Sequence, residues 1–292
     1  MDNQNPDESL FFVCGTGKCG STWLQLLLDA HPDIICRGEA HLITDLVKPV
    51  LEAVDAYNMA ITTKGGRLAD AEYERADHLK FSIEEMIQFS RYLGLQIFSR
   101  WKGDSPIRCI GDKTPGNLDT LPMLNRIFPE AKFVHIIRDG RDTAVSLWHF
   151  NMKLNIGKNL STYGNFSGFV KFFTHSWKDR ISLARQQMTD IGIHKYHEVR
   201  YEDLLHYPHE TLAKLLKFLQ MEHSSSTLEH CFEVTQFEKL SGGRKSGEED
   251  TESFYRKGII GDWKNTFKPE DNEYFYQHAG ELMNNLGYKK HG

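Results

Sequence analysis

Short apolar runs alternate with longer segments of helical periodicity along most of the chain. The short runs predict buried strands, at residues 11–14, 34–36, 107–111, 132–137 and 196–200. The segments between them repeat apolar residues every three or four positions and predict helices, at residues 23–31, 42–57, 82–101, 118–128 and 165–188, with two more that start near Asp139 and Tyr201. Strands that alternate with helices favour a parallel sheet covered on both faces, whose ligands bind beyond the carboxyl ends of the strands. The pattern therefore predicts an α/β fold with a central parallel sheet flanked by helices.

Local signals refine some of these boundaries. Pro32 ends the first predicted helix, and Ser82 with Glu85 three residues later has the spacing of a capping box. Residues 62–79 are polar and include two consecutive glycines, which predicts a loop or lid.

The size and composition of the chain are those of one soluble globular domain. It has 292 residues, of which 40% are hydrophobic and 26% charged, so a single domain over residues 1–292 is expected. The formal net charge is -5, so we expect no broad basic surface and no nucleic acid partner. Any anion site must then be a local cluster of lysines and arginines.

Several features favour a cytoplasmic protein. No run of eighteen apolar residues predicts a transmembrane segment, and residues 1–8 are polar and acidic, unlike a signal peptide. The five cysteines are odd in number and contain no CxxC pair, which predicts free thiols in a reducing compartment and no zinc site.

The candidate chemistry begins between the first strand and the first helix. Residues 15–22 form a glycine-rich turn that contains Lys18, Ser21 and Thr22. Glycines let the backbone approach an anion closely, and the N–H groups at a helix N-terminus point toward it, so the turn is typical of a phosphate loop. The magnesium-dependent nucleotide loop does not fit, because Cys19 replaces the Ser/Thr of that pattern and Phe12 its first glycine. A glycine-rich turn that only caps a buried helix is the structural alternative.

A second charged segment, residues 136–146, follows a predicted strand in the same way. Arg138 can form paired hydrogen bonds with a phosphate, and Ser146 lies two turns into the following helix. A solvated cluster of salt bridges explains the charges of this segment equally well.

These two segments and a third one resemble sulfotransferases. Residues 18–23 resemble their 5′-phosphosulfate loop, Arg138 and Ser146 match their 3′-phosphate segment, and residues 256–264 resemble their Arg-Lys-Gly-x-x-Gly-x-Trp-Lys segment. The resemblance implies a P-loop-like sulfotransferase fold, and the cosubstrate 3′-phosphoadenosine 5′-phosphosulfate (PAPS), its product adenosine 3′,5′-bisphosphate (PAP) and no metal. The cofactor-binding residues that it implies are Gly17, Lys18, Cys19, Gly20, Ser21, Thr22, Trp23, Arg138, Ser146, Tyr201, Arg256, Lys257 and Gly258.

The catalytic residues follow a mixed pattern. Lys18 would stabilise the charge that develops on the leaving 5′-phosphate, and Lys113 matches a second family lysine near the reacting centre. Cytosolic sulfotransferases use a histidine in Lys-Thr-His as general base, but this chain has Pro115 in its place. Residues 28–39 instead resemble tyrosylprotein sulfotransferases, whose catalytic glutamate aligns with Glu39, although their nearby arginine is replaced by His41. Glu39 and His41 are therefore both candidates for the base.

Other interpretations stay open at this point. A phosphate-loop nucleotide kinase and a non-catalytic PAP-binding module are the alternatives to a sulfotransferase. The acceptor is undefined and includes small molecules, glycans and peptides, and so is the oligomeric state. Segments 60–105 and 150–195 are expected to shape the acceptor pocket, for which the second supplies many aromatic residues, although aromatics at helical spacing are typical of a core.

Overall fold

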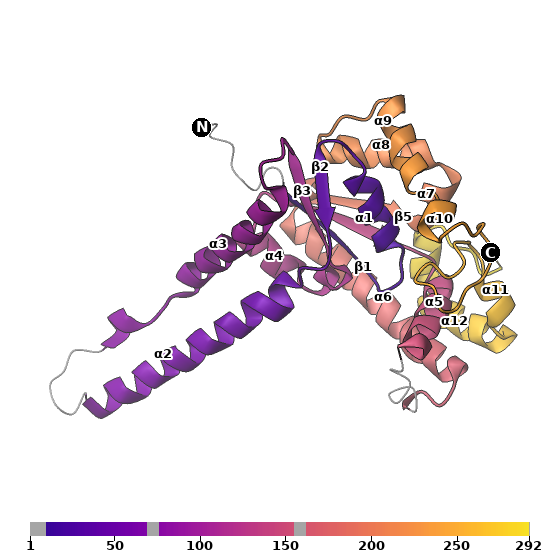
Figure 1. The fold of residues 1–292 in the computed structure, drawn as a ribbon. Helices are drawn as coiled ribbons and strands as arrows, with labels where there is room; N and C mark the ends of the chain where they lie inside the picture. The colour runs from indigo at the N-terminus through magenta and orange to yellow at the C-terminus, as the bar shows by residue number, and fades with distance from the viewer. Residues whose placement is uncertain (1–9, 69–75, 155–161, 292) are drawn as a thin grey trace.

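The computed structural model describes residues 10–68, 76–154 and 162–291 and contains a five-stranded parallel sheet. The strand order is β2-β3-β1-β4-β5 and every neighbouring pair is parallel. The strands span β1 Leu10–Gly15, β2 Ile34–Arg37, β3 Cys109–Lys113, β4 Lys132–Ile137 and β5 Tyr196–Arg200. The predicted α/β fold with a central parallel sheet is confirmed, and helices cover both faces of it (Figure 1).

The strand β1 shows how the sequence builds two apolar layers. Its alternate residues Phe11 and Val13 pack with α1 (Ser21–Asp29) and α8 (Pro208–Leu219), whereas Leu10, Phe12 and Cys14 pack with α3 (Ile83–Lys102) and α4 (Leu121–Ile127) on the other face. Because both faces are covered, the strand is apolar at nearly every position instead of alternating with polar residues.

Helices fill the segments between the strands. The α-helices are α1 Ser21–Asp29, α2 Lys48–Leu68, α3 Ile83–Lys102, α4 Leu121–Ile127, α5 Gly140–Lys153, α6 Phe166–Ile191, α7 Tyr201–His206, α8 Pro208–Leu219, α9 Ser225–Val234, α10 Phe237–Leu240, α11 Trp263–Thr266 and α12 Pro269–Asn285. A π-helix, η1, spans Leu42–Val47, and short 3-10 helices span η3 Ala76–Leu79, η4 Pro115–Asp119 and η7 Ile193–Lys195. The capping box at Ser82 and Glu85 is confirmed. None of the helices in the described ranges is both long and apolar enough to cross a membrane.

Two boundaries differ from the sequence prediction. The prediction of a loop from residue 62 is wrong, because α2 continues to Leu68. Extending an existing helix costs much less free energy than starting one, and this advantage exceeds the helix-destabilising cost of the two glycines. Residues 76–79 form a 3-10 helix, and residues 69–75 lie outside the described part of the chain. Figure 1 shows α2 projecting well beyond the sheet. Strand β3 runs two residues further than predicted, because the polar Asp112 and Lys113 are buried at its end.

Candidate functional site

The turn after β1 is shaped to bring backbone N–H groups to the carboxyl edge of the sheet. Lys18 and Gly20 have positive φ angles of 65° and 96°, and the N–H of Cys19 donates to the carbonyl of Thr16 at 3.3 Å. Gly20 is required here, because a Cβ atom on it would lie 2.4 Å from Cδ2 of Tyr201. Helix α1 then begins at Ser21 without a side-chain cap, so its first N–H groups are available to an anion.

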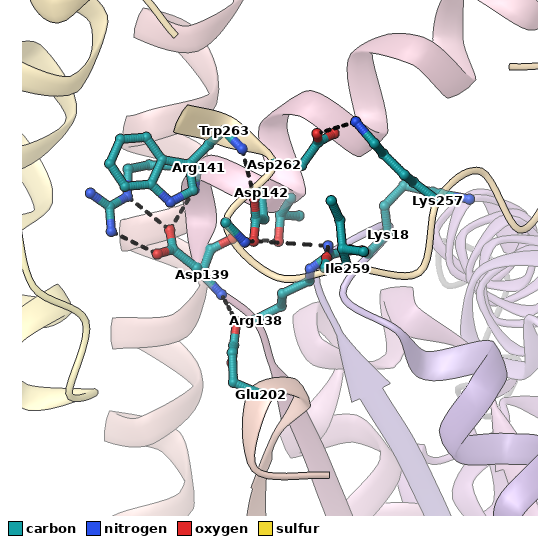
Figure 2. Close-up of polar contacts among 12 residues, drawn as sticks. Lys18, Arg138, Asp139, Arg141, Asp142, Glu202, Lys257, Ile259, Asp262 and Trp263 are labelled. Atoms are coloured by element: carbon teal, nitrogen blue, oxygen red, sulfur yellow. Dashed lines mark hydrogen bonds and ion pairs between the residues drawn. The ribbon is translucent and has the colours of Figure 1, made fainter. Parts of the chain in front are cut away.

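Arg138 lies beside this turn, at the end of β4. Its Nη1 donates to the carbonyl of Lys18 at 3.5 Å and its Nη2 to the carbonyl of Ile259 at 3.0 Å, so it joins two segments far apart in the sequence (Figure 2). The guanidinium lies 4.5 Å from the ring centre of Tyr201, and its nearest carboxylate, Asp142, is 4.0 Å away. Its Nε is buried without a hydrogen-bond partner, which leaves a donor for a bound anion.

The other charges of the segment 138–142 hold the scaffold together. Asp142 accepts hydrogen bonds from the N–H groups of Gly261 and Trp263 at 2.7 and 2.9 Å, and Glu202 accepts one from the N–H of Asp139 at 2.9 Å (Figure 2). Arg141 is almost fully buried and stacks 3.7 Å above the ring of Trp263. The alternative of a solvated charge cluster is therefore wrong, because these residues are buried and bind one another and the backbone.

Arg256 and Lys257 are brought to the same place by the segment between α10 and α11. Both cations pair with Asp262, Lys257 at 2.7 Å, and both also face Glu249, which pairs with Arg256 and lies 3.8 Å from Lys257. The Nε of Arg256 is buried without a partner. These two side chains are already bound to carboxylates of the protein, more closely than Arg138, whose ion pair with Asp142 is 4.0 Å long.

These segments surround a cavity of about 570 Å³. We call Lys18, Arg138, Arg256 and Lys257 the basic end of this cavity. Of the residues predicted from the sequence, the cavity is lined by Gly17, Lys18, Gly20, Ser21, Thr22, Trp23, Glu39, Arg138, Ser146, Tyr201, Arg256, Lys257 and Gly258. The structure thus brings together three segments that the sequence analysis identified separately.

Cys19, His41 and Lys113 do not line the cavity. The Cys19 side chain is fully buried in the core, and burial raises the pKa of its thiol. Its part in the site is limited to the backbone of the turn. His41 and Lys113 both pair with Glu39 and contact the site through that carboxylate.

Glu39 also lines the cavity, in the loop that follows β2. Its Oε1 lies 2.6 Å from Nζ of Lys113 and its Oε2 lies 3.2 Å from Nε2 of His41. Asp112 fixes the loop by accepting hydrogen bonds from the N–H of Ala40 at 3.0 Å and from Asn117 at 2.9 Å. We call Glu39 with its partners Lys113 and His41 the carboxylate end of the cavity. Lys113 is buried, whereas 40% of the Glu39 side chain is exposed.

Sequence analysis missed the apolar residues of the cavity. Its wall includes Leu147, Phe150, Leu204, Phe232, Phe237 and Phe254, which no motif distinguishes from core residues. Of the aromatic residues in segment 150–195, Phe150 lines the cavity and Phe172 is exposed. The others that were expected to shape the acceptor pocket belong to a hydrophobic cluster between α6 and α12, together with Phe275. Helical spacing was the correct signal for these residues.

The pKa of Lys18, in the basic end, is changed by burial. Burial, together with the positive charges of Arg138 and Arg256, lowers the pKa of Lys18 to about 8. Its ammonium is therefore still charged at neutral pH and begins to lose its proton above it. Within the described ranges, no three His, Cys, Asp or Glu side chains converge in a way that could hold a metal ion.

Comparison with known proteins gives the family. The family model described as "Sulfotransferase family" matches residues 11–225. A protein-tyrosine sulfotransferase of Drosophila melanogaster is 28% identical over 235 residues, which cover 78% of this chain and 42% of the relative. A cytosolic sulfotransferase 6 of Arabidopsis thaliana is 24% identical, covering 98% of this chain and 82% of the relative. The chain spans about half the length of the first protein-tyrosine relatives that it matches.

Solved structures share the fold. Mouse sulfotransferase SULT7A1, solved in complex with PAP, superposes with a TM-score of 0.61 at 18% identity, over 96% of this chain and 85% of that one. Retinol dehydratase, solved with androsterone and the inactive cofactor PAP, gives a TM-score of 0.51 at 21% identity, over 96% and 81% of the two chains. With its family model matched over residues 11–225, the chain belongs to the sulfotransferase family.

Proposed function

We propose that the protein transfers a sulfuryl group from PAPS to a hydroxyl or amine acceptor. The observation that carries this proposal is the convergence of Lys18, Arg138 and Arg256 on one cavity that also contains the carboxylate of Glu39. A cationic site next to a possible general base meets the two needs of an in-line transfer without a metal.

The basic end fits a nucleotide with phosphates at both its 5′ and 3′ positions. The uncapped start of α1 and Lys18 would hold the 5′ side, and Arg138 with Ser146 the 3′-phosphate. The buried Nε atoms of Arg138 and Arg256 supply two donors that have no partner in the protein. When bound, PAPS supplies the sulfuryl group and leaves as PAP. Cys19, buried where a magnesium-dependent nucleotide loop needs a hydroxyl group, argues against a kinase.

The carboxylate end would take up the proton of the acceptor. Glu39 is our choice for the base, because it lines the cavity and His41 does not. The ammonium of Lys113 at 2.6 Å holds the carboxylate in place, and the half-exposed His41 on its other oxygen connects it with solvent.

The acceptor that we favour is the hydroxyl of a tyrosine in a peptide. The support comes from the names of the relatives, protein-tyrosine sulfotransferases, and from the exposure of Glu39, which leaves room for a large acceptor. One residue difference argues against this acceptor: His41 stands where the tyrosylprotein sulfotransferases have an arginine. The cytoplasm stays our proposed location, supported by five buried cysteines that are all free thiols.

A transfer assay with radiolabelled PAPS tests the proposal. The acceptors are tyrosine-containing peptides, small phenols and glycans, each with the wild-type protein and with Lys18→Met. Lys18→Met should lower the rate about a hundredfold or more, because it removes the charge beside the leaving oxygen. The matched control is Lys48→Met, whose lysine is highly exposed outside the cavity and should not matter. Transfer to no acceptor, or an unchanged rate with Lys18→Met, would contradict the proposal.

A further inference from the structure

The ammonium of Lys18 lies between two aromatic rings. Its Nζ is 4.4 Å from the ring centre of Phe150, on α5, and 4.1 Å from that of Phe254, in the segment between α10 and α11. The two rings meet edge to face at 6.4 Å, with an interplanar angle of 88°. The Lys18 ammonium therefore lies in the corner formed by two touching rings that come from different elements.

Such a pair of rings favours the charged form of a lysine. The face of a phenyl ring attracts a cation, and the attraction grows when the site is partly removed from water. Lys18 needs this support, because burial and two nearby arginines act against its charge. Lys18 also has a left-handed backbone conformation with φ of 65°, which sets the direction in which its Cα–Cβ bond leaves the turn.

Phe254 also connects Lys18 with the rest of the basic end. It lies two residues before Arg256, in a segment that folds back on itself: the N–H of Gly247 donates to the carbonyl of Lys257 at 2.9 Å, and that of Asp250 to the carbonyl of Arg256 at 3.0 Å. A shift of Arg256 would thus carry Phe254 with it. Phe150 lies on α5, which contacts this segment through Phe254 and through a hydrogen bond from Lys153 to the carbonyl of Glu252.

We propose that Phe150 and Phe254 are positioning residues that hold the Lys18 ammonium in the site, and that Phe254 ties its position to the segment carrying Arg256. The contact itself is independent of the activity; its consequence for turnover rests on the proposed function. Phe150 contributes its ring from α5, and Phe254 contributes its ring from the segment 247–257.

Chemical labelling of lysines tests the contact without any assay of transfer. The nucleotide-free protein is treated with a limiting amount of an acylating reagent at pH 7, and modification of Lys18 is quantified by mass spectrometry against the exposed Lys48. Loss of one ring should raise the acylation rate of Lys18 relative to that of Lys48 about two- to fivefold. Without the attraction of the ring for the cation, a larger fraction of Lys18 is the neutral amine, which is the form that the reagent acylates. We expect this for Phe254→Leu and for Phe150→Leu, and a near wild-type rate for Phe254→Trp, which restores a ring. Phe172→Leu is the matched control, since that ring is exposed to a similar degree, 53% against 48% for Phe254, and lies outside the cavity.

Two results would overturn the proposal. One is a Lys18 rate in Phe254→Leu equal to that in Phe172→Leu. The other is an equal rise in Phe254→Leu and Phe254→Trp, which would show that any change of the segment exposes the lysine. In transfer assays, the alkaline limb of the pH profile should move to lower pH in Phe254→Leu and return in Phe254→Trp. If wild-type protein transfers nothing while the labelling pattern holds, the proposed function fails and the contact stands.

Discussion

The two ends of the cavity hold their charges in different ways. The basic end is assembled from three segments that are more than 100 residues apart. Its arginines, one buried and one partly buried, contact carbonyls, rings and carboxylates. The carboxylate end depends on one short loop after β2 and on Lys113, and its glutamate is partly open to solvent. The difference teaches that nucleotide affinity depends on the whole fold, whereas the choice of base depends on a few local residues. Changes at the two ends should therefore affect different quantities.

Glu39→Gln should give the largest effect. The variant keeps the shape of the side chain but removes the base, so transfer should fall about a hundredfold to ten-thousandfold while PAP affinity changes little. Turnover at saturating PAPS and calorimetry with PAP measure the two quantities. If Glu39→Gln stays active and His41→Ala does not, His41 is the base. If PAP affinity falls as much as turnover, the two ends are not separate.

Arg138→Ala should act mainly on binding. A charged hydrogen bond is worth on the order of 1.5–3 kcal/mol, so PAP affinity should fall about ten- to a hundredfold. Adenosine 5′-phosphate, which lacks the 3′-phosphate, should lose much less in the same calorimetric experiment. Arg138→Lys is the companion variant, because it keeps the charge but not the paired hydrogen bonds. Its PAP affinity should lie between those of the wild-type protein and Arg138→Ala. Equal losses for both nucleotides would assign Arg138 to the scaffold.

The pH dependence of binding should report Lys18. Since its pKa is about 8 in the free protein, the ammonium is charged at pH 7 and mostly neutral at pH 9. PAP affinity should therefore fall by up to about tenfold over this interval. Calorimetry across the range measures it, with Lys18→Met as the comparison, in which the fall should disappear. A fall of the same size in Lys18→Met would place the titrating group elsewhere.

Arg256→Ala should give the smallest loss, about threefold to tenfold in PAP affinity, because Glu249 and Asp262 already bind this cation. Glu249→Gln should act in the opposite direction and tighten PAP binding, since it frees Arg256 and Lys257 from a competing anion. Titration of both variants with PAP measures the pair. A loss with Arg256→Ala as large as that with Arg138→Ala would remove the contrast between the two arginines.

The sequence predicted the features that depend on local chemistry. The turn around Gly20 and Lys18 was predictable from residue types, because glycines and a lysine before a helix start are typical of an anion-binding loop. The close approach of Tyr201 to Gly20 became visible only in the structure. The five strands were located from their apolar runs. The end of β3 was missed because Asp112 and Lys113 are polar, and the same polarity marks their place near the site.

Features that depend on the approach of distant segments could not be predicted. The rings around Lys18 come from Phe150 and Phe254, which have no spacing relation to the lysine. The pairing of Arg256 with Glu249 is also a product of the folded segment. In the sequence, Asp139, Arg141 and Asp142 look like surface charges. Their burial follows from the packing of α5 against α11 and from the hydrogen bond of Arg141 to Asn272 on α12.

The affinity of the wild-type protein for PAP, compared with adenosine 5′-phosphate and with ATP plus magnesium, tests the central claim most directly. That claim is that the basic end recognises a nucleotide with phosphates at both the 5′ and 3′ positions. Calorimetry should show PAP bound about ten- to a hundredfold more tightly than adenosine 5′-phosphate, with no requirement for magnesium. Equal affinities for PAP and adenosine 5′-phosphate, or tighter binding of ATP with magnesium, would contradict it.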